Sequence, residues 1–503
     1  MNAKVVINRL QTHVPGLDEV LGGGLPEFSF NLIAGQPGCG KTTLAHQMMF
    51  ALATPERPAI YFTVLGEPPL KMLRYQQQFD YFDSRAINQS VRFISLSDDA
   101  LSGNFDRVLE RIVAEVTAVS PGLVFVDSFR SVTMAGQGVG SGAAGEALNP
   151  QLGLQQFVQQ LGVLMTSWQA TTFLIGEYYD ETDSNPVFTV ADGLIWLRQS
   201  VQRNSMVRKL EIVKMRGQAT LPGLHTFRID HSGIRVFAPA RALAHPGAGP
   251  GDLGDRAGTG VTELDAMLGG GLPRGYSLLV AGPSGSGKSV LASSFLAEGA
   301  RHGERAVLAA FEQRPTRFRN RQLMDLIDRG LVALIDSREP DLSIDEIVLL
   351  ILREVQRLGA TRVVLDSLSG FELSLAPSFQ ADFRESLLRL VTALAASGVT
   401  VLLTCELEDR YTDLRFSPYG AAFLTDAIIV QRYIEVDSRI LRAMAVVKVR
   451  ASAHSDELRQ YHIRNDGIHV GERLPDQEGL LSGRPMRAQV DATPPGASPR
   501  DGS

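Results

Sequence analysis

Cysteine is nearly absent from this chain, which has two among its 503 residues, Cys39 and Cys405. Two isolated thiols cannot build the disulfide framework on which small secreted domains depend, so a reducing compartment is expected. Long apolar runs are also missing, because no uninterrupted stretch reaches the ~20 residues that a transmembrane helix requires. The first residues lack the basic-then-apolar pattern of a signal peptide. Together these absences predict a cytoplasmic protein without membrane association.

An excess of positive charge is missing as well. The chain carries 49 Lys and Arg residues against 55 Asp and Glu residues, for a net charge of −6. This balance provides no general attraction to nucleic acid or to an anionic membrane, and no basic stretch interleaved with aromatic residues is evident. A nucleic-acid partner is therefore not expected.

What the chain does have is a phosphate-binding loop in two copies. Each copy matches G-x-x-x-x-G-K-[ST], follows an apolar run and precedes a helix-like segment, which is the context that the motif requires. The alternative, a glycine-rich turn without a ligand, accounts poorly for two matches in the same setting. The first copy is Gly35-Gln36-Pro37-Gly38-Cys39-Gly40-Lys41-Thr42, followed by Thr43, and the second is Gly282-Pro283-Ser284-Gly285-Ser286-Gly287-Lys288-Ser289, followed by Val290.

The residue types of both loops suit a phosphate chain with a bound metal ion. Glycines let backbone N–H groups surround phosphate oxygens, and the start of the following helix adds partial positive charge. Lys41 and Lys288 are predicted to reach the outer phosphates, and the hydroxyls of Thr42 and Ser289 to ligate Mg²⁺. Cys39 is interpreted as a small residue at a variable position of the loop, with redox sensitivity as the alternative.

The two loops belong to a longer internal repeat. Residues 12–26 read THVPGLDEVLGGGLP and residues 259–273 read TGVTELDAMLGGGLP, and an offset of 247 residues holds from these segments to the lysines of the loops. A period of this length indicates a duplicated domain, because solenoid repeats are only tens of residues long. Each half is long enough to bury a core of its own.

Both halves alternate apolar, β-rich runs with amphipathic helical segments, which predicts mostly parallel sheets covered by helices on both faces. Ligands of such sheets bind at the carboxyl ends of the strands, where both loops fall. Further alternating runs near 210–215, 225–229, 443–449 and 459–463 are predicted to add antiparallel strands. The main strands are predicted near 30–34, 58–64, 122–126, 171–175 and 194–198, and again near 277–281, 305–311, 361–365, 399–404 and 427–431.

Composition shifts predict the domain limits. An Ala-, Gly- and Pro-rich stretch separates the halves, and the last residues lose all periodicity. We predict a first domain over 1–237, a linker over 238–256, a second domain over 257–471 and a disordered tail over 472–503.

One predicted strand of each half ends in an acidic residue, at Asp127-Ser128 and at Asp366-Ser367. An Asp at a strand end near a phosphate loop is the usual second anchor of nucleotide-bound Mg²⁺. Strand ends also turn through Asp for purely structural reasons, but the occurrence of one such Asp per half favours the metal role for both Asp127 and Asp366.

A nucleotide hydrolase also needs a group that orients or deprotonates water. The second predicted strand of each half is followed by one candidate, Glu67 in the first half and Glu312 in the second. The alternative for each is a solvated loop glutamate.

These motifs together resemble the KaiC family of double-domain, RecA-like ATPases. The resemblance covers about residues 3–470 and rests on the TG-x-x-x-LD-x-x-L-GGGLP lead, the paired loops and the Asp-Ser strand ends. It implies two tandem RecA-like P-loop NTPase domains, ATP and Mg²⁺ as cofactors, and a hexameric ring with ATP bound between subunits. It also implies possible protein partners in a signalling or clock system.

The resemblance gives a role to Lys214-Met215-Arg216-Gly217 and to Lys448-Val449-Arg450-Ala451. The Lys and Arg of this segment are expected to reach the γ-phosphate held by a neighbouring subunit, where they would stabilise charge on the transferring phosphoryl group. The alternative is an exposed basic strand end.

Two departures from the family pattern bear on catalysis. The family usually carries two adjacent glutamates after the second strand, whereas this chain has Gly66-Glu67 and Glu312-Gln313. At the positions of the family's Ser-Thr phosphorylation pair it has Ala422 and Phe423, neither of which carries a hydroxyl. Nearby hydroxyls remain on Ser417, Tyr419 and Thr425.

Three hypotheses follow for the function. The leading one is a ring-forming ATPase that acts as a signalling or clock-type regulator. The second is a Ser/Thr autokinase that uses a displaced acceptor hydroxyl. The third is a RecA-like DNA-binding motor, which the charge balance disfavours.

Overall fold

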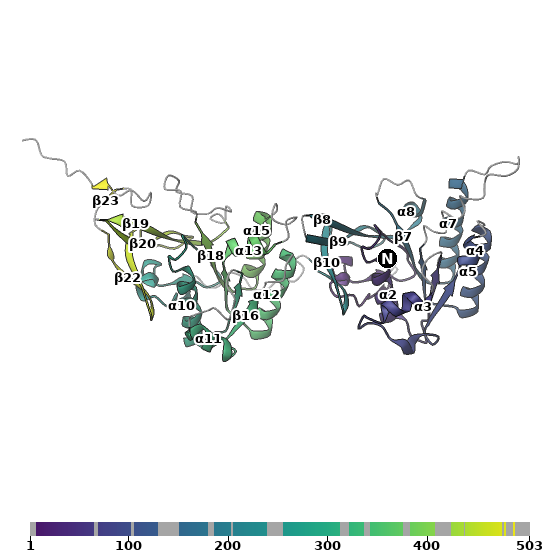
Figure 1. The fold of residues 1–503 in the computed structure, drawn as a ribbon, viewed down its shortest axis with the longest axis horizontal. Coiled ribbons are helices and arrows are strands. Elements are labelled where there is room, and N and C mark those ends of the chain that lie inside the picture. Colours follow the sequence, from purple (N-terminus) through teal and green to yellow (C-terminus); the bar gives the residue numbers. More distant parts are fainter. Residues whose placement is uncertain are drawn as a thin grey trace, which may run out of the picture. The chain divides into compact units, whose positions relative to one another are not determined.

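The computed structural model describes residues 7–64, 69–101, 105–128, 150–179, 186–202, 205–238, 255–311, 321–336, 343–375, 383–407, 424–436, 438–474, 477–478 and 486–487. The chain divides into two compact units, 1–242 and 243–503 (Figure 1). The predicted linker and tail lie largely outside the described residues. In the described part of the chain, none of the helices combines the length and hydrophobicity that crossing a bilayer requires.

Each unit is built on one nine-stranded sheet. In the first unit the strand order is β11-β10-β9-β8-β3-β7-β6-β4-β5, and the six strands from β8 to β5 run parallel while β9, β10 and β11 are antiparallel additions. Two RecA-like α/β domains in tandem are thus confirmed. The strands are β3 Phe30–Gly35, β4 Ala59–Thr63, β5 Val91–Ser95, β6 Leu123–Asp127, β7 Thr171–Glu177, β8 Gly193–Gln202, β9 Ser205–Met215, β10 Leu224–Asp230 and β11 Gly233–Val236.

The second unit repeats this topology, with strand order β16-β15-β17-β18-β14-β19-β20-β21-β22. The order is the same when it is read from the opposite edge, so the repeat in the sequence is a repeat of the fold. Its strands are β14 Ser277–Gly282, β15 Ala306–Ala310, β16 Val332–Asp336, β17 Arg362–Asp366, β18 Thr400–Glu406, β19 Ala427–Val436, β20 Arg439–Val449, β21 Arg459–Arg464 and β22 Gly467–Arg473.

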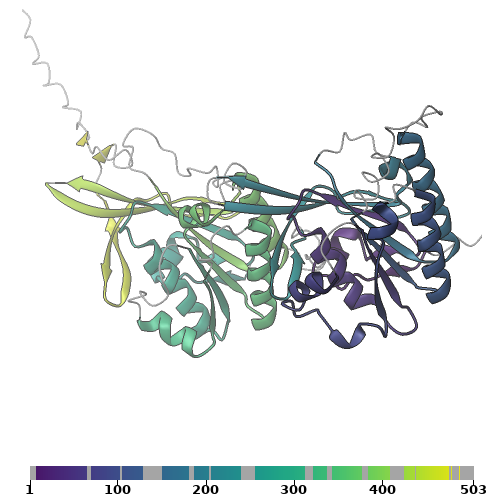
Figure 2. The same ribbon diagram turned by 45° about the vertical axis from the view of Figure 1, so that its right-hand side comes forward.

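Helices cover both faces of each sheet (Figures 1 and 2). Those of the first unit are α1 Leu17–Leu21, α2 Lys41–Leu52, α3 Pro69–Gln76, α4 Ser97–Leu101, α5 Phe105–Val119, α7 Pro150–Ser167 and α8 Pro186–Val190. Those of the second are α9 Thr262–Met267, α10 Lys288–Arg301, α11 Arg321–Asp328, α12 Ile344–Leu358, α13 Leu368–Ser374 and α15 Phe383–Ala396.

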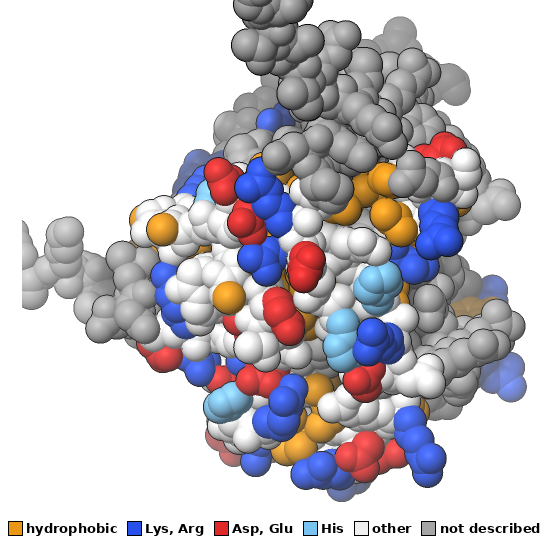
Figure 3. Space-filling view, turned by 90° about the vertical axis from the view of Figure 1, so that its left-hand side faces the viewer, with side chains coloured by type: hydrophobic (Ala, Val, Ile, Leu, Met, Phe, Trp, Pro, Cys, Tyr) orange, Lys and Arg blue, Asp and Glu red, His pale blue; other side chains and the backbone are white. Residues whose placement is uncertain are grey.

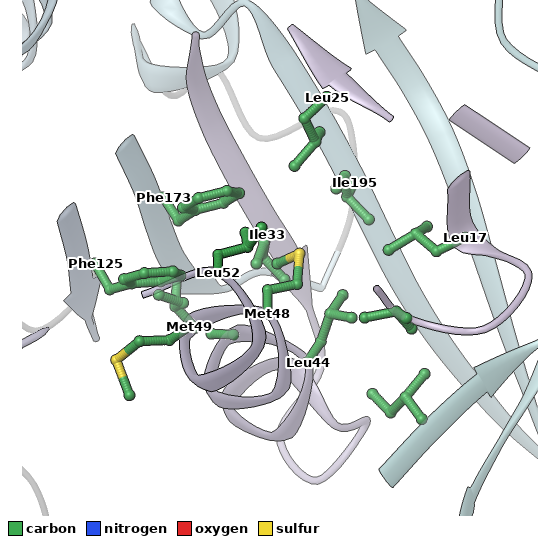
Figure 4. Close-up of a cluster of buried hydrophobic side chains, with 14 of the residues drawn as sticks. Leu17, Leu25, Ile33, Leu44, Met48, Met49, Leu52, Phe125, Phe173 and Ile195 are labelled. Carbon is green, nitrogen blue, oxygen red and sulfur yellow. The ribbon is translucent and has the colours of Figure 1, made fainter. Parts of the chain in front are cut away.

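Strand β3 shows why both faces are covered. Ile33 packs into the core under α2, whereas Leu32 and Ala34 pack into the opposite core with α5 and α7. Successive side chains of a strand point to opposite faces, so a continuous apolar run demands a helix on each side. Figure 4 shows the first of these cores, in which Leu44 and Met48 of α2 lie against Ile33. The same packing holds the phosphate loop, which joins β3 to α2.

The backbone conformation explains why the GGGLP segment is repeated in both halves of the sequence. Gly22, Gly23 and Gly24 adopt φ values of 77°, 113° and 109°, a left-handed region that other residues rarely enter. The preceding Thr12 donates from both its backbone N and its hydroxyl to Asp18 Oδ1, at 2.8 and 2.9 Å. Thr259 and Asp265 repeat these bonds in the second unit, both at 2.7 Å.

One parallel strand at the far edge of each sheet is missing from the sequence prediction. Strand β5 pairs with β4 at the edge of the sheet and has just one fully buried residue, and β16 takes the same place beside β15. An edge strand that lies half in solvent needs no continuous apolar run, so its sequence VRFIS does not stand out.

A buried histidine predicts acid sensitivity of the first unit. His46 of α2 is fully buried beside Tyr61, and burial lowers its pKa to about 4 against an opposing contribution from the Gln76 amide. The unfolded chain takes up this proton near pH 6.5, so the contribution to stability is complete above that pH and is lost as the pH falls towards 4. The loss is about 3 kcal/mol.

Tryptophan fluorescence can measure this loss in the first unit, because both tryptophans, Trp168 and Trp196, lie there. Urea unfolding at pH 7 and pH 4.5 should show a falling unfolding free energy, and His46→Phe should flatten that fall. An equal pH dependence in the variant would show that other groups cause it.

Candidate nucleotide-binding sites

The first phosphate loop lies at the carboxyl end of β3, at the start of α2. Gly38 and Gly40 adopt φ values of 75° and 106°, and a Cβ at Gly40 would lie 2.7 Å from the side chain of Ile229. Only glycine fits such a cradle. Lys41 Nζ curls back over the loop and donates to the Gln36 carbonyl at 2.8 Å. The loop therefore has the shape of an anion site with its cation in place.

The second loop repeats this arrangement. Gly285 and Gly287 have φ values of 76° and 99°, and Lys288 Nζ donates to the carbonyls of Gly282 and Pro283 at 2.9 and 2.8 Å. The loop borders a cavity of about 260 Å³. Its lining includes Ser284, Lys288, Ser289, Asp366, Ser367 and Glu406.

The structure brings the first predicted metal pair together. Asp127 ends β6, and its Oδ2 accepts hydrogen bonds from Thr42 Oγ1 at 2.9 Å and from Tyr61 OH at 2.7 Å. Burial raises the pKa of this carboxyl, while the bonds from Tyr61 and Thr42 and the charge of Lys41 oppose the rise. The peptide bond that follows Asp127 is cis.

Asp366 ends β17 at the equivalent place, and the peptide bond after it is also cis. Its Oδ1 accepts a hydrogen bond from Thr404 Oγ1 of β18 at 2.5 Å. Ser289 and Asp366 line the same cavity, as the sequence prediction requires.

The residues present fit a nucleoside triphosphate with Mg²⁺. Each loop presents backbone N–H groups and a lysine to phosphate. Each also has a hydroxyl and the carboxylate of a strand-end aspartate near the start of the helix, and Mg²⁺ sites usually have few such protein ligands. Bound Mg²⁺ would neutralise charge on the outer phosphates. Thr42 with Asp127, and Ser289 with Asp366, would hold it.

Sequence reasoning missed one acidic residue at each site. Glu177 ends β7 opposite Gly35, and Glu406 ends β18 opposite Gly282, so both stand beside the first residue of a phosphate loop. The charge of Glu177 contributes to the raised pKa of Asp127. The signal was available, because the fourth predicted strand of each half also runs into a glutamate.

The predicted basic pairs lie at the other end of the sheet from the loops. Arg216 follows β9, and its guanidinium pairs with Asp192 at 3.1 Å while 59% of its side chain is exposed. The Asp192 carboxylate also accepts from the backbone N of Phe30, where β3 begins. Lys214 Nζ donates to the carbonyl of Thr189 at 3.1 Å.

The second unit repeats this geometry. Arg450 pairs with Asp426 at 3.2 Å with 52% of its side chain exposed, and Lys448 Nζ donates to the Thr425 carbonyl at 2.6 Å. Partial burial, followed by the neighbouring arginine, lowers the pKa of both Lys214 and Lys448.

Several predicted residues lie outside the described part of the chain. These are the two candidate glutamates and the positions of the lost phosphorylation pair with two nearby hydroxyls, namely Glu67, Glu312, Ser417, Tyr419, Ala422 and Phe423. Thr425 is described and is fully buried, with its carbonyl engaged by Lys448.

Comparison with known proteins agrees with this geometry. The model of the family described as "ATPase: KaiC" matches residues 10–241 and again 257–474. The chain belongs to the KaiC ATPase family. It is 27% identical to the circadian clock oscillator protein KaiC of Picosynechococcus sp., a match that covers 96% of this chain and 94% of that protein. The KaiC of Rippkaea orientalis and the KaiC 1 of Synechocystis sp. match equally, at 27% identity over 96% of this chain and 93% of theirs.

Family membership has a direct consequence for the two units. The matched segments coincide with the two sheets, so each unit is a complete KaiC-type ATPase domain with its own phosphate loop. The expected KaiC-family fold, ATP binding and P-loop ATPase class are thereby supported.

Proposed function

We propose that this KaiC-family protein hydrolyses ATP at the interfaces of a hexameric ring of its own copies and acts as a signalling or clock-type regulator. The observation that carries the proposal is the position of the basic pairs. Their arginines are exposed and their lysines are partly buried, and both pairs are far from the phosphate loop of their own unit.

The strand register supports this separation. Arg216 donates from its backbone N to Asp192 O, and Asp192 in turn donates to Phe30 O, so Arg216 lies level with the beginning of β3. The loop begins at Gly35, five residues further along, which is roughly 16 Å at ~3.3 Å per residue. An arginine side chain at the opposite end of the sheet does not reach the phosphate loop of its own domain. A neighbouring copy is therefore the natural recipient.

The ion pairs of these arginines are also weak enough to exchange. Exposed salt bridges contribute about 0–1 kcal/mol, so Arg216 and Arg450 would give up Asp192 and Asp426 at little cost for a phosphate oxygen. Within each proposed site, Lys41 or Lys288 would bind the outer phosphates, and the neighbour's Lys and Arg would stabilise charge on the transferring group.

The water in each proposed site needs a positioning group. We assign this role to Glu67 in the first site and to Glu312 in the second, each the remaining carboxylate of the pair that the family usually carries. With one carboxylate in place of two, each site keeps one proton acceptor for the attacking water.

Size-exclusion chromatography with light scattering, run with ATP, with ADP and without nucleotide, tests the assembly. We expect ATP to shift the protein to a hexamer, and steady-state ATP turnover to accompany that shift. A monomer that is indifferent to nucleotide would refute the ring and the roles of both arginines.

The family's autokinase activity at the Ser-Thr pair is not expected here, because Ala422 and Phe423 cannot accept a phosphoryl group. After incubation with ATP and Mg²⁺, mass spectrometry of the peptides that span residues 405–430 should find no added phosphate. A phosphopeptide from this segment would instead establish the autokinase hypothesis with a displaced acceptor.

One face of the second unit agrees with a protein partner more than with nucleic acid. Figure 3 shows one face of the second unit, on which acidic and basic side chains are interspersed. A mixture of this kind creates no continuous positive field for a phosphate backbone.

A further inference from the structure

The two sites hold their metal-anchoring aspartates by different means. Asp127 and Asp366 occupy equivalent positions, since each ends a strand that pairs with the same two neighbours in its sheet. The hydroxyl that supports Asp127 comes from Tyr61 on one neighbour, whereas the hydroxyl that supports Asp366 comes from Thr404 on the other.

The register shows that the supporting hydroxyl comes from a different neighbouring strand in each unit. Tyr61 pairs with Phe125 and Leu308 pairs with Val364, in each case two residues before the aspartate. The place of Tyr61 is therefore taken by Leu308 in the second unit, where no hydroxyl is possible.

On the other side, the first unit has Ile175 where the second has Thr404. Ile175 pairs with Ile33 of the central strand, and Thr404 pairs with Val280 at the equivalent place. Isoleucine has no hydroxyl. Each aspartate therefore has a hydroxyl-bearing side chain on one neighbouring strand and an apolar side chain at the corresponding position on the other.

Side-chain length explains which residue type stands on which side. Ile175 lies directly opposite Asp127 in the register. Leu403 pairs with Leu365, so the next residues of the two strands, Thr404 and Asp366, also lie opposite each other. A short threonine reaches a direct neighbour. Tyr61 lies on a diagonal, a separation of roughly 7–8 Å that only a long side chain can bridge.

The surroundings of the two hydroxyls make them effective. Tyr61 and Thr404 are both fully buried, so water does not compete for their bonds. Tyr61 is held between Phe125 and Phe93, with ring centroids at 5.9 and 5.5 Å. A carboxylate whose partner is fixed in this way keeps one orientation towards the hydroxyl of the phosphate loop, which for Asp127 is Thr42 at 2.9 Å.

We infer that Tyr61 is a positioning residue of the first site and Thr404 its counterpart in the second, so that Mg²⁺ binding depends on a phenol in one ATPase domain and on a threonine hydroxyl in the other. This inference rests on the proposed function of both sites as Mg²⁺–nucleotide sites. Partners that orient a metal ligand commonly change metal affinity 10- to 100-fold when they are removed.

The test isolates one site at a time and titrates Mg²⁺ against a fixed concentration of fluorescent mant-ADP. With Lys288→Ala inactivating the second site, Tyr61→Phe should raise the Mg²⁺ concentration at half-saturation about 10-fold. Binding of mant-ADP in the presence of EDTA should stay unchanged, because the phosphate loop is intact. With Lys41→Ala in place instead, Thr404→Val should have the same effect on the second site, and Thr404→Ser should restore it.

A matched control and a rescue separate positioning from folding. Tyr81→Phe removes another phenol of the first unit, one that donates to Gln76 and not to Asp127, and should leave the Mg²⁺ dependence unchanged. Adding Ile175→Thr to Tyr61→Phe should recover most of the loss, because it supplies the hydroxyl from the side that the second unit uses.

One result would contradict the positioning role of Tyr61, and another would contradict the proposed function of the first site. An unaltered Mg²⁺ half-saturation in Tyr61→Phe, with normal Mg²⁺-dependent binding by the Lys288→Ala parent, would overturn the positioning role alone. Failure of the Lys288→Ala parent itself to bind mant-ADP with Mg²⁺ would instead overturn the proposed function of the first site.

Discussion

Lys41→Ala should abolish nucleotide binding at the first site and, with it, assembly of the ring. The Lys41 ammonium lies against the carbonyl of Gln36, and the residue as a whole is 7% exposed, so a phosphate that replaces that carbonyl would meet a largely desolvated charge. Removal of one member of such a buried charge pair costs about 2–5 kcal/mol, which is at least ~30-fold in affinity. Mant-ATP binding in the Lys288→Ala background, combined with light scattering, measures both effects.

Lys288→Ala is the matched variant for this prediction. We expect it to lose nucleotide at the second site while ATP still promotes assembly through the first. If Lys288→Ala dissociated the ring and Lys41→Ala did not, the assignment of assembly to the first site would be wrong.

Arg216→Ala should remove catalysis and leave nucleotide binding by the same subunit nearly intact. Arg216 lies at the opposite end of the sheet from the loop of its own domain, so its loss does not disturb that loop. In phosphoryl-transfer enzymes an arginine of this kind contributes 10³- to 10⁵-fold to kcat, and we expect a loss of about 10³-fold at the first site. Steady-state turnover in the Lys288→Ala background, beside mant-ATP binding, separates the two effects.

The control for Arg216→Ala is Arg92→Ala, which removes an exposed arginine from edge strand β5. It should retain full turnover. A loss of nucleotide binding in Arg216→Ala as large as its loss of turnover would show that the arginine acts in nucleotide binding and would contradict its proposed role in the transfer step.

Much of the fold was predictable because the strongest sequence signals have local causes. The GGGLP lead requires three left-handed glycines, and the apolar run of β3 requires cover on both faces. The strand ends at Asp127 and Asp366 were predicted from position alone, and the structure places Asp127 on Thr42 and Asp366 in the cavity of the second loop. These features depend on residues that are close in sequence or in the same strand.

The parts that escaped prediction depend on cross-strand neighbours. Edge strand β5 carries no distinctive apolar run, because one side of it faces solvent. The sequence VALID of β16 is apolar, but only its pairing with β15 shows that it extends the sheet. The contrast between Tyr61 and Thr404 becomes visible only when register is known, since each residue looks like an ordinary member of a buried strand. The place of Glu177 and Glu406 beside the phosphate loops likewise depends on register, because it follows from the pairing of β7 with β3 and of β18 with β14.

Mixing two inactive variants tests the central claim, that each site is completed by another copy of the chain. Both variants carry Lys288→Ala, and one adds Lys41→Ala while the other adds Arg216→Ala. The Lys41→Ala subunit is not expected to assemble by itself, but ATP on the first site of Arg216→Ala subunits can bring it into mixed rings. Such a ring contains interfaces at which the intact phosphate loop of an Arg216→Ala subunit meets the intact arginine of a Lys41→Ala subunit. We predict that mixing, with ATP present, restores turnover to a sizeable fraction of that of the Lys288→Ala parent. No recovery of turnover in rings shown by mass spectrometry to contain both subunits would contradict the account.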